Sequence, residues 1–275
     1  RARMIMGPGS VVGGASTAPR HAAGSHHTPN DMIFASMRDD RAERKQMMPT
    51  PFAALANHKI VPVVTTDSAE QGLEIALALA RGGLPVAEIT FRTPAAADVI
   101  RAIRDSGPRA PDEDGVGSGA DVLVGAGTIV RPDQVDAAVA AGAHFVVSPG
   151  LSRAVVERCH EHGIPIIPGA VTATEIQAAI ELGVQTVKFF PAETSGGAAA
   201  IRALTAPFAE VGFMPTGGVG PANLGDYLSI AGVVAAGGSW MLPAASITRG
   251  DTDDITRLTR EAVELAARYA PVGLR

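Results

Sequence analysis

Cysteine, lysine and aromatic residues are all scarce in this chain of 275 residues. Cys159 is the only cysteine, so no disulfide can form within the chain, which fits a reducing cytosol and a cytoplasmic location. No uncharged apolar run is as long as the roughly 18 residues that a transmembrane helix needs, so we expect no membrane partner. The formal net charge of −5 gives no support for a nucleic acid partner, because nucleic acids select basic patches.

The scarcity of lysine is the most informative of these features. The basic residues are nearly all arginine, and the lysines are Lys45, Lys59 and Lys188. Only Lys188 lies within an apolar segment, VQTVKFF at 184–190, where an unpaired charge costs on the order of several kcal/mol. Arginine cannot lose its proton in a protein, whereas a buried lysine can. We therefore interpret Lys188 as a reactive group.

The composition divides the chain near residue 50. Residues 1–50 are rich in Gly, Pro, Ser, Ala and His and have no apolar period, which predicts a disordered tail or an upstream extension. Residues 51–275 are predicted to form the folded domain. The stretch GPRAPDEDGVGSGAD at 107–121 is polar and glycine-rich, so we predict a surface loop there.

Short apolar runs alternate with segments of helical spacing throughout the predicted domain. The predicted strands cover 60–65, 86–91, 122–127, 144–149, 164–169, 184–190, 211–216 and 232–237, and the predicted helices cover 68–83, 95–105, 132–142, a segment ending at 162, 173–182, 197–206, 221–229 and 252–268. Eight strand–helix units predict an α/β fold with a parallel sheet closed into a (β/α)8 TIM barrel. An open, doubly wound sheet is the alternative, but the first turn, TTDSAEQG, lacks the GxGxxG pattern typical of that fold.

Paired glycines follow the last two predicted strands. TGGVG covers 216–220, and GGSW covers 237–240. Paired glycines let backbone N–H groups approach an anion, and the loops after strands 7 and 8 are the usual phosphate position in this barrel. The alternative is that these glycines only make tight turns.

Other candidate residues lie within the predicted strands or just after them. Glu88, within VAEITF, can face the barrel centre together with Lys188, either as a general acid/base or as a structural ion-pair partner. Arg92 can hold a carboxylate with its two-pronged donor geometry. Thr128 lies at the rim or caps the next helix, and Pro149 shapes the pocket mouth.

This set of residues suits Schiff-base chemistry. Desolvation favours the neutral form of a lysine, and a neutral amine can attack a ketone to give an iminium. The iminium draws electrons from the adjacent carbon, so that a C–C bond can break, and Glu88 is the candidate for moving protons. The histidines show no zinc-like spacing, and we expect neither a metal nor a cofactor.

Residues 52–270 resemble the 2-keto-3-deoxy-6-phosphogluconate (KDPG) aldolase and 4-hydroxy-2-oxoglutarate aldolase family. The stretches that carry the resemblance are EITFRT, VGAGT, VVSPG, VKFFPAE, PTGGV and GGSW, in the family's order. The resemblance implies a class I aldolase of the Entner–Doudoroff pathway. It would cleave 2-dehydro-3-deoxy-6-phosphogluconate to pyruvate and D-glyceraldehyde 3-phosphate. Some members also cleave 4-hydroxy-2-oxoglutarate, and the family is typically homotrimeric.

The resemblance also implies a role for each matched position. Lys188 would form the Schiff base, and Glu88 would be the general acid/base. The residues implied to bind substrate are Arg92 and Thr128 at the pyruvyl carboxylate, Pro149 and Phe190 along the pocket, and Thr216, Gly217, Gly218, Gly238 and Ser239 at the phosphate end.

Three other functions stay open on the sequence alone. A related branch of the family acts on the galactonate epimer of the substrate, although EITFRT with Arg92 is closer to the gluconate branch. A phosphosugar isomerase or epimerase on the same barrel would need the phosphate loops but no imine. A non-catalytic barrel that binds phosphorylated metabolites would leave Lys188 without a purpose.

Overall fold

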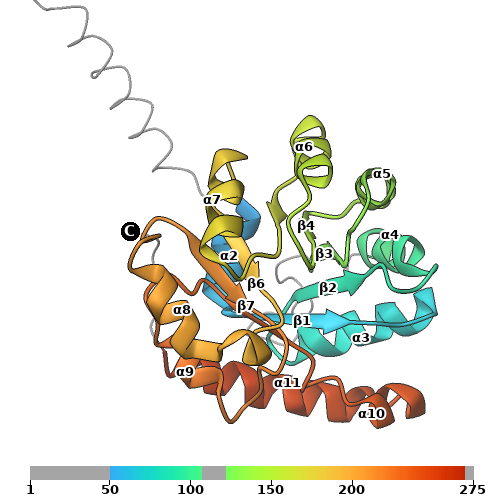
Figure 1. Cartoon of the computed structure of the whole chain (residues 1–275). Coiled ribbons are helices and arrows are strands. Elements are labelled where there is room, and N and C mark those ends of the chain that lie inside the picture. The colour runs from blue at the N-terminus through green and yellow to red at the C-terminus, as the bar shows by residue number, and fades with distance from the viewer. Residues whose placement is uncertain (1–49, 107–121, 270–275) are drawn as a thin grey trace, which may run out of the picture. The chain divides into compact units, whose positions relative to one another are not determined.

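Strands and helices alternate along residues 50–106 and 122–269, the part of the chain that the computed structural model describes (Figure 1). The strands are β1 (Ile60–Val64), β2 (Val86–Thr90), β3 (Leu123–Gly127), β4 (Phe145–Val147), β5 (Ile166–Ile167), β6 (Thr186–Phe189), β7 (Gly212–Pro215) and β8 (Ala236–Gly238). The helices are α2 (Thr50–His58), α3 (Ala69–Arg81), α4 (Ala96–Ser106), α5 (Pro132–Ala141), α6 (Arg153–Glu161), α7 (Ala173–Glu181), the 3-10 helix η1 (Glu193–Ser195), α8 (Gly197–Thr205), α9 (Leu224–Leu228), α10 (Ala244–Arg249) and α11 (Thr252–Ala267). The predicted tail, apart from Thr50, and the predicted loop 107–121 lie outside the described residues.

All the strands are parallel and join into one closed ring. Six strands pair in the order β5-β4-β3-β2-β1-β8, and β6 pairs with β7. The backbone of Lys188 joins β6 to the end of β5, because its N–H donates to Pro168 O at 2.8 Å and its carbonyl accepts from Ala170 N at 2.9 Å. The N–H of Phe213 in β7 donates to Gly232 O at 2.8 Å, just before β8. The predicted eight-stranded barrel is confirmed.

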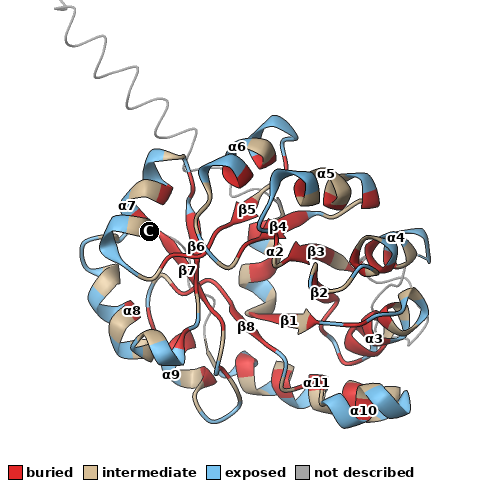
Figure 2. Cartoon of the chain, turned by 45° about the vertical axis from the view of Figure 1, so that its right-hand side comes forward, coloured by how far each residue is buried: buried red, intermediate tan, exposed pale blue. Residues whose placement is uncertain are grey.

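Helices surround the barrel and bury only one side of themselves. Figure 2 shows buried strands in the middle and helices whose inner sides are buried while their outer sides are exposed. In α3, for example, Ile75 and Leu79 are buried one turn apart, whereas Glu74 is exposed. This is the amphipathic pattern expected of helices that cover a parallel sheet.

The last strand begins later than predicted, because the first part of its apolar run pairs with β7 and only the later part pairs with β1. Val233 and Val234 pair with Phe213 of β7, whereas β8 proper pairs with β1. The strand therefore covers Ala236–Gly238 rather than 232–237. The fifth strand is also shorter than predicted, since prolines flank it at Pro165 and Pro168 and cannot donate ladder hydrogen bonds.

The helices differ from the prediction at several places, and the short η1 is one of those that were not predicted. Helix α2 precedes the first strand and contributes the buried side chains of Phe52 and Leu55, and α10 lies between β8 and α11; neither was predicted. Helix α9 begins at Leu224 rather than 221, because Asn223 accepts a hydrogen bond from Gly220 N–H at 2.8 Å and so closes a turn before the helix.

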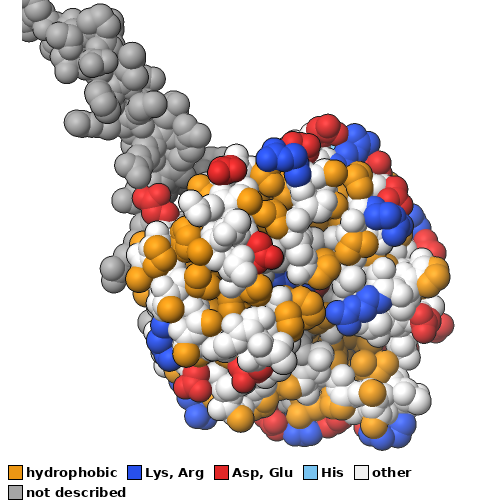
Figure 3. All heavy atoms as spheres, viewed as in Figure 1, with side chains coloured by type: hydrophobic (Ala, Val, Ile, Leu, Met, Phe, Trp, Pro, Cys, Tyr) orange, Lys and Arg blue, Asp and Glu red, His pale blue; other side chains and the backbone are white. Residues whose placement is uncertain are grey.

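Of the helices in the described ranges, none is both long and apolar enough to cross a bilayer. Acidic and basic side chains are interspersed on the face shown in Figure 3.

Candidate active site

Lys188 and Glu88 form a buried pair inside the barrel. Lys188 Nζ on β6 lies 3.2 Å from Glu88 Oε1 on β2, and the two side chains are 5% and 0% exposed. The second carboxylate oxygen, Glu88 Oε2, is buried and has no hydrogen-bond partner among the described residues. The pair therefore combines an amine with a carboxylate oxygen that is still free to take a proton.

A glycine on the neighbouring strand makes room for this carboxylate. Glu88 pairs in register with Gly125, yet a Cβ atom at Gly127 would lie only 2.2 Å from Glu88 Oε1. The Glu88 side chain thus leans along β3 toward the carboxyl ends of the strands. That is the end at which barrels of this type carry their active sites.

Phe190 lies beside the lysine side chain, and the Pro149 backbone lies next to Gly169, which pairs with the lysine backbone. Lys188 Nζ is 5.3 Å from the centroid of the Phe190 ring, within the range of a cation–π contact. Gly169 forms a parallel bridge with Lys188, and a Cβ atom on Gly169 would lie 2.1 Å from the carbonyl oxygen of Pro149. The structure therefore brings both predicted lining residues to the same side of the barrel as Lys188.

Thr128 and Arg92 stand at the rim. Thr128 has a φ of 59°, a conformation that costs a threonine energy and is enriched at functional sites. The alternative that Thr128 caps the next helix is wrong, because α5 begins at Pro132 with Arg131 as its N-cap. Arg92 is exposed just beyond β2. Within the described ranges no hydrogen bond or ion pair joins Thr128 or Arg92 to another predicted site residue.

The two glycine-rich loops lie next to each other. Thr216, at the end of β7, forms a parallel bridge with Gly237 of β8, and its hydroxyl is buried without a hydrogen-bond partner in the described part of the chain. A Cβ atom on Gly237 would lie 2.3 Å from Thr216 Oγ1. Gly217 and Gly218 have φ values of 96° and 83°, which favour glycine. Here the backbone conformation requires both glycines of the pair.

These two loops contain backbone N–H groups that have no hydrogen-bond partner among the described residues. Gly238 packs against the ring of Trp240, since a Cβ atom there would lie 2.1 Å from a ring carbon, and Ser239 beside it is exposed. The backbone N–H groups of Gly218 and Ser239 donate no hydrogen bond to any described residue. Unpaired donors on adjacent loops suit an anion such as a phosphate.

A pair of threonine hydroxyls at the barrel mouth was not predicted. Thr65 Oγ1 and Thr90 Oγ1 are 2.8 Å apart, just after β1 and at the end of β2. Thr90 is two residues beyond Glu88 and therefore faces the same side of the strand. The alternation of side chains in VAEIT, which places Thr90 on the same face as Glu88, could have predicted the position of Thr90.

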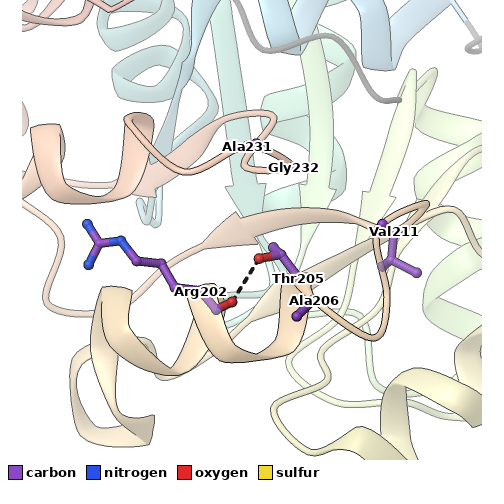
Figure 4. Close-up of a pocket in the computed structure, with 7 residues that line it drawn as sticks. Arg202, Thr205, Ala206, Val211, Ala231 and Gly232 are labelled. Atoms are coloured by element: carbon purple, nitrogen blue, oxygen red, sulfur yellow. Dashed lines mark hydrogen bonds between the residues drawn. The ribbon is translucent and has the colours of Figure 1, made fainter.

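Other candidate groups lie away from this end of the barrel. A pocket of about 220 Å³ is lined by Arg202, Thr205, Ala206, Ala209, Val211, Ala231 and Gly232, before β7 and β8 begin. Figure 4 shows the Arg202 guanidinium pointing away from Thr205, and neither a lysine nor a carboxylate lines the pocket.

Cys159 is buried in α6, and burial raises the pKa of its thiol to about 12. Among the described residues, no group of three or more His, Cys, Asp or Glu is placed to hold a metal ion.

The chain is similar to proteins of one family. The family model "Aldolase: KDPG and KHG aldolase" matches residues 53–258. A 2-dehydro-3-deoxy-phosphogluconate aldolase of Treponema pallidum is 46% identical, over 79% of this chain and 98% of its own length. The KHG/KDPG aldolase of Escherichia coli K12 is 42% identical, over 76% of this chain and 93% of its own length.

A solved structure agrees in fold and in family. The KDPG aldolase of Legionella pneumophila, with pyruvate captured as a covalent carbinolamine intermediate, superposes with a TM-score of 0.71 at 34% identity, over 78% of this chain and 98% of that chain. The family match covers most of the chain and includes both Lys188 and Glu88. The chain therefore belongs to the KDPG and KHG aldolase family, and it is an aldolase, a lyase that cleaves carbon–carbon bonds.

Proposed function

We propose that this protein is a class I aldolase that cleaves 2-dehydro-3-deoxy-6-phosphogluconate to pyruvate and D-glyceraldehyde 3-phosphate. The observation that carries the proposal is the buried Lys188–Glu88 pair, with Nζ and Oε1 3.2 Å apart. A lysine amine and a carboxylate with a free oxygen are the two groups that imine chemistry needs. Neither a metal nor a cofactor enters the proposed reaction.

Lys188 acts as the nucleophile in this proposal. Its neutral amine adds to the C2 ketone of the substrate, and loss of water gives an iminium. Glu88 accepts the proton of the C4 hydroxyl as the C3–C4 bond breaks, and the bond's electrons move into the iminium to form an enamine. The protonated Glu88 then returns a proton to C3, and hydrolysis of the new iminium releases pyruvate and restores the Lys188 amine.

The two ends of the substrate are held by different loops. Arg92 and Thr128 bind the carboxylate of the pyruvyl part, with Pro149 and Phe190 lining the pocket. Support comes from the exposed position of Arg92, whose guanidinium pairs with no described residue, and from the left-handed conformation of Thr128.

The phosphate end meets the loops after β7 and β8. Thr216, Gly217, Gly218, Gly238 and Ser239 bind it in this proposal. Support comes from the Thr216 hydroxyl and the N–H groups of Gly218 and Ser239, none of which has a hydrogen-bond partner among the described residues.

A cleavage assay tests the proposed substrate. Purified protein is given 2-dehydro-3-deoxy-6-phosphogluconate, and pyruvate release is followed with a lactate dehydrogenase couple. We expect turnover, with faster cleavage of the gluconate than of the galactonate epimer and weaker cleavage of unphosphorylated 4-hydroxy-2-oxoglutarate. Absence of pyruvate from protein whose circular dichroism spectrum is native would overturn the proposal.

The other proposals concern the setting of the enzyme. We infer a cytoplasmic homotrimer whose catalytic domain covers residues 51–275, because the family resemblance implies trimers and the family match lies at 53–258. Light scattering should give three times the mass of one chain. Removal of residues 1–49, which ends before α2 begins at Thr50, should leave turnover unchanged. A monomeric or inactive truncated protein would contradict these inferences.

A further inference from the structure

Glu193 and Tyr227 form a hydrogen-bonded pair outside the proposed catalytic and substrate-binding residues. The Tyr227 hydroxyl on α9 donates to Glu193 Oε1 in η1, 34 residues earlier in the chain. Tyr227 is one of the largest fully buried side chains of the described residues. The pair thus ties the segment after β6 to a buried anchor in α9.

Glu193 packs directly on the glycine turn after β7. Its backbone N–H donates to Gly217 O at 3.1 Å, and Ala192 N–H donates to Thr216 O at 2.8 Å. A Cβ atom on Gly218 would lie 2.5 Å from Glu193 Cγ. Glu193 is therefore both hydrogen-bonded to the Gly217–Gly218 turn and packed against it.

The start of α9 holds the same turn from its other end. Asn223 Nδ2 donates to Gly218 O at 3.0 Å, and Asn223 Oδ1 accepts from Gly220 N–H at 2.8 Å. Asn223 is the N-cap residue of α9, and Tyr227 lies one turn further along that helix. The glycine turn is thus held by α9 twice, once directly and once through Glu193.

The charge of Glu193 makes its orientation important. A carboxylate beside a phosphate site repels the ligand unless the carboxylate is paired or directed elsewhere. Here the Tyr227 hydroxyl holds Glu193 Oε1 beside Gly197, the first residue of α8, where a negative charge is favourable at a helix N-terminus. Burial, together with the Glu193 carboxylate, raises the pKa of Tyr227, so the phenol stays a donor across the neutral range.

We propose that Glu193, held by Tyr227, is a positioning residue that fixes the Gly217–Gly218 turn relative to Lys188 and so confers preference for phosphorylated keto acids. Lys188 and Glu193 belong to one short segment, five residues apart, that runs from the imine centre to the turn. The inference rests on the proposed phosphate site. It adds residues that would not touch the substrate themselves.

The test compares a phosphorylated with an unphosphorylated substrate. Tyr227→Phe and Glu193→Ala each remove the hydrogen bond, whereas Glu193→Gln keeps an acceptor oxygen for the Tyr227 hydroxyl. Tyr269→Phe is the matched control, since it removes the only other tyrosine hydroxyl of the chain, which contacts α9 at Gly225. The KM and kcat of each variant are measured with 2-dehydro-3-deoxy-6-phosphogluconate and with 4-hydroxy-2-oxoglutarate.

We expect Tyr227→Phe and Glu193→Ala to raise the KM for the phosphorylated substrate about tenfold, the effect of losing one hydrogen bond to a charged group. Their kcat, and their KM for 4-hydroxy-2-oxoglutarate, should stay within about twofold of wild type, and Glu193→Gln should resemble wild type. Equal losses with both substrates, or no change with either, would overturn the inference. If Tyr227→Phe fails to fold, Glu193→Ala decides alone, because Glu193 is exposed.

The failure of this inference differs from the failure of the proposed function. Borohydride trapping with pyruvate and cleavage by the wild-type protein test the proposed function alone. A wild-type protein that traps pyruvate and cleaves the phosphorylated substrate, with both KM values unchanged in Glu193→Ala, rejects only the positioning role. A wild-type protein that cleaves neither substrate rejects the proposed function and the inference with it.

Discussion

Lys188 Nζ lies 3.2 Å from Glu88 Oε1 in the barrel interior. Among the described residues, neither side chain forms an ion pair with any other group. Two buried charges that depend on each other are costly to separate, because the remaining one is left without water or a counter-charge. The contact therefore has consequences for stability as well as for catalysis, and double substitution can distinguish the two.

Lys188→Met should destabilise the protein by about 3–5 kcal/mol at pH 7, because it leaves Glu88 buried without its partner. Adding Glu88→Gln removes the stranded charge and should restore much of that loss. Urea unfolding of the two single variants and the double variant measures the interaction energy. A Lys188→Met protein as stable as wild type would mean that the pair contributes nothing to the fold.

Glu88→Gln should separate imine formation from cleavage. The amine of Lys188 remains, so pyruvate can still be trapped on it, although more slowly. Loss of the proton acceptor should lower cleavage by roughly 10²–10⁴-fold, the usual contribution of a general acid/base. Steady-state kinetics and adduct mass spectrometry on the same sample check this. Cleavage within twofold of wild type would assign the proton transfer to another group.

Gly127→Ala should displace the Glu88 carboxylate, because the new Cβ atom would lie 2.2 Å from Oε1. Overpacking of this kind costs about 1–3 kcal/mol, and cleavage should fall together with the thermal midpoint. Gly150→Ala is the control for stability, since no heavy atom lies within 4 Å of the Cβ position there. Equal midpoints and activity for Gly127→Ala and wild type would show that Glu88 does not need this space.

Thr216→Val should weaken phosphate binding without destabilising the fold. Its hydroxyl is buried and has no partner within the described ranges, so a valine of similar shape removes no hydrogen bond of the free protein. We expect an unchanged or higher thermal midpoint and a several-fold higher KM, about what one neutral hydrogen bond contributes. A clear fall in the midpoint would show instead that the hydroxyl is structural.

Cys159 should be inert in the native protein. Its side chain is fully buried and its pKa is raised to about 12, so the reactive thiolate is scarce at neutral and mildly alkaline pH. Dithionitrobenzoate at pH 8 should release no chromophore until denaturant is added. Rapid reaction with the folded protein would show that α6 opens far more readily than its packing implies.

Lys188 and Glu88 could be predicted from the sequence, because each is a charged residue within an apolar strand. A lysine in VQTVKFF and a glutamate in VAEITF are each anomalous in a buried strand, and the period of two aims both inward. The paired glycines after the seventh and eighth strands could also be predicted to lie close together, because a closed barrel brings the carboxyl ends of neighbouring strands to the same edge.

Contacts between distant segments could not be predicted in the same way. Tyr227 looks like any apolar helix residue, and only the fold brings its hydroxyl to Glu193. Residues 232–238 divide between two neighbours, with Val233 next to β7 and Ala236–Gly238 paired with β1, and this division depends on the stagger of the closed barrel, which no local pattern records. Nothing in the stretch VGAGT indicates that Gly127 leaves space for the Glu88 carboxylate, which lies on another strand.

Imine formation between Lys188 and the keto acid can be tested directly by trapping. The protein is incubated with saturating pyruvate and sodium borohydride, and the modified peptide is located by mass spectrometry. The only other lysines of the chain, Lys45 and Lys59, serve as internal controls. We expect one reduced pyruvate adduct per chain, on Lys188, and none in Lys188→Met. No adduct from folded protein, or an adduct on another lysine, would contradict it.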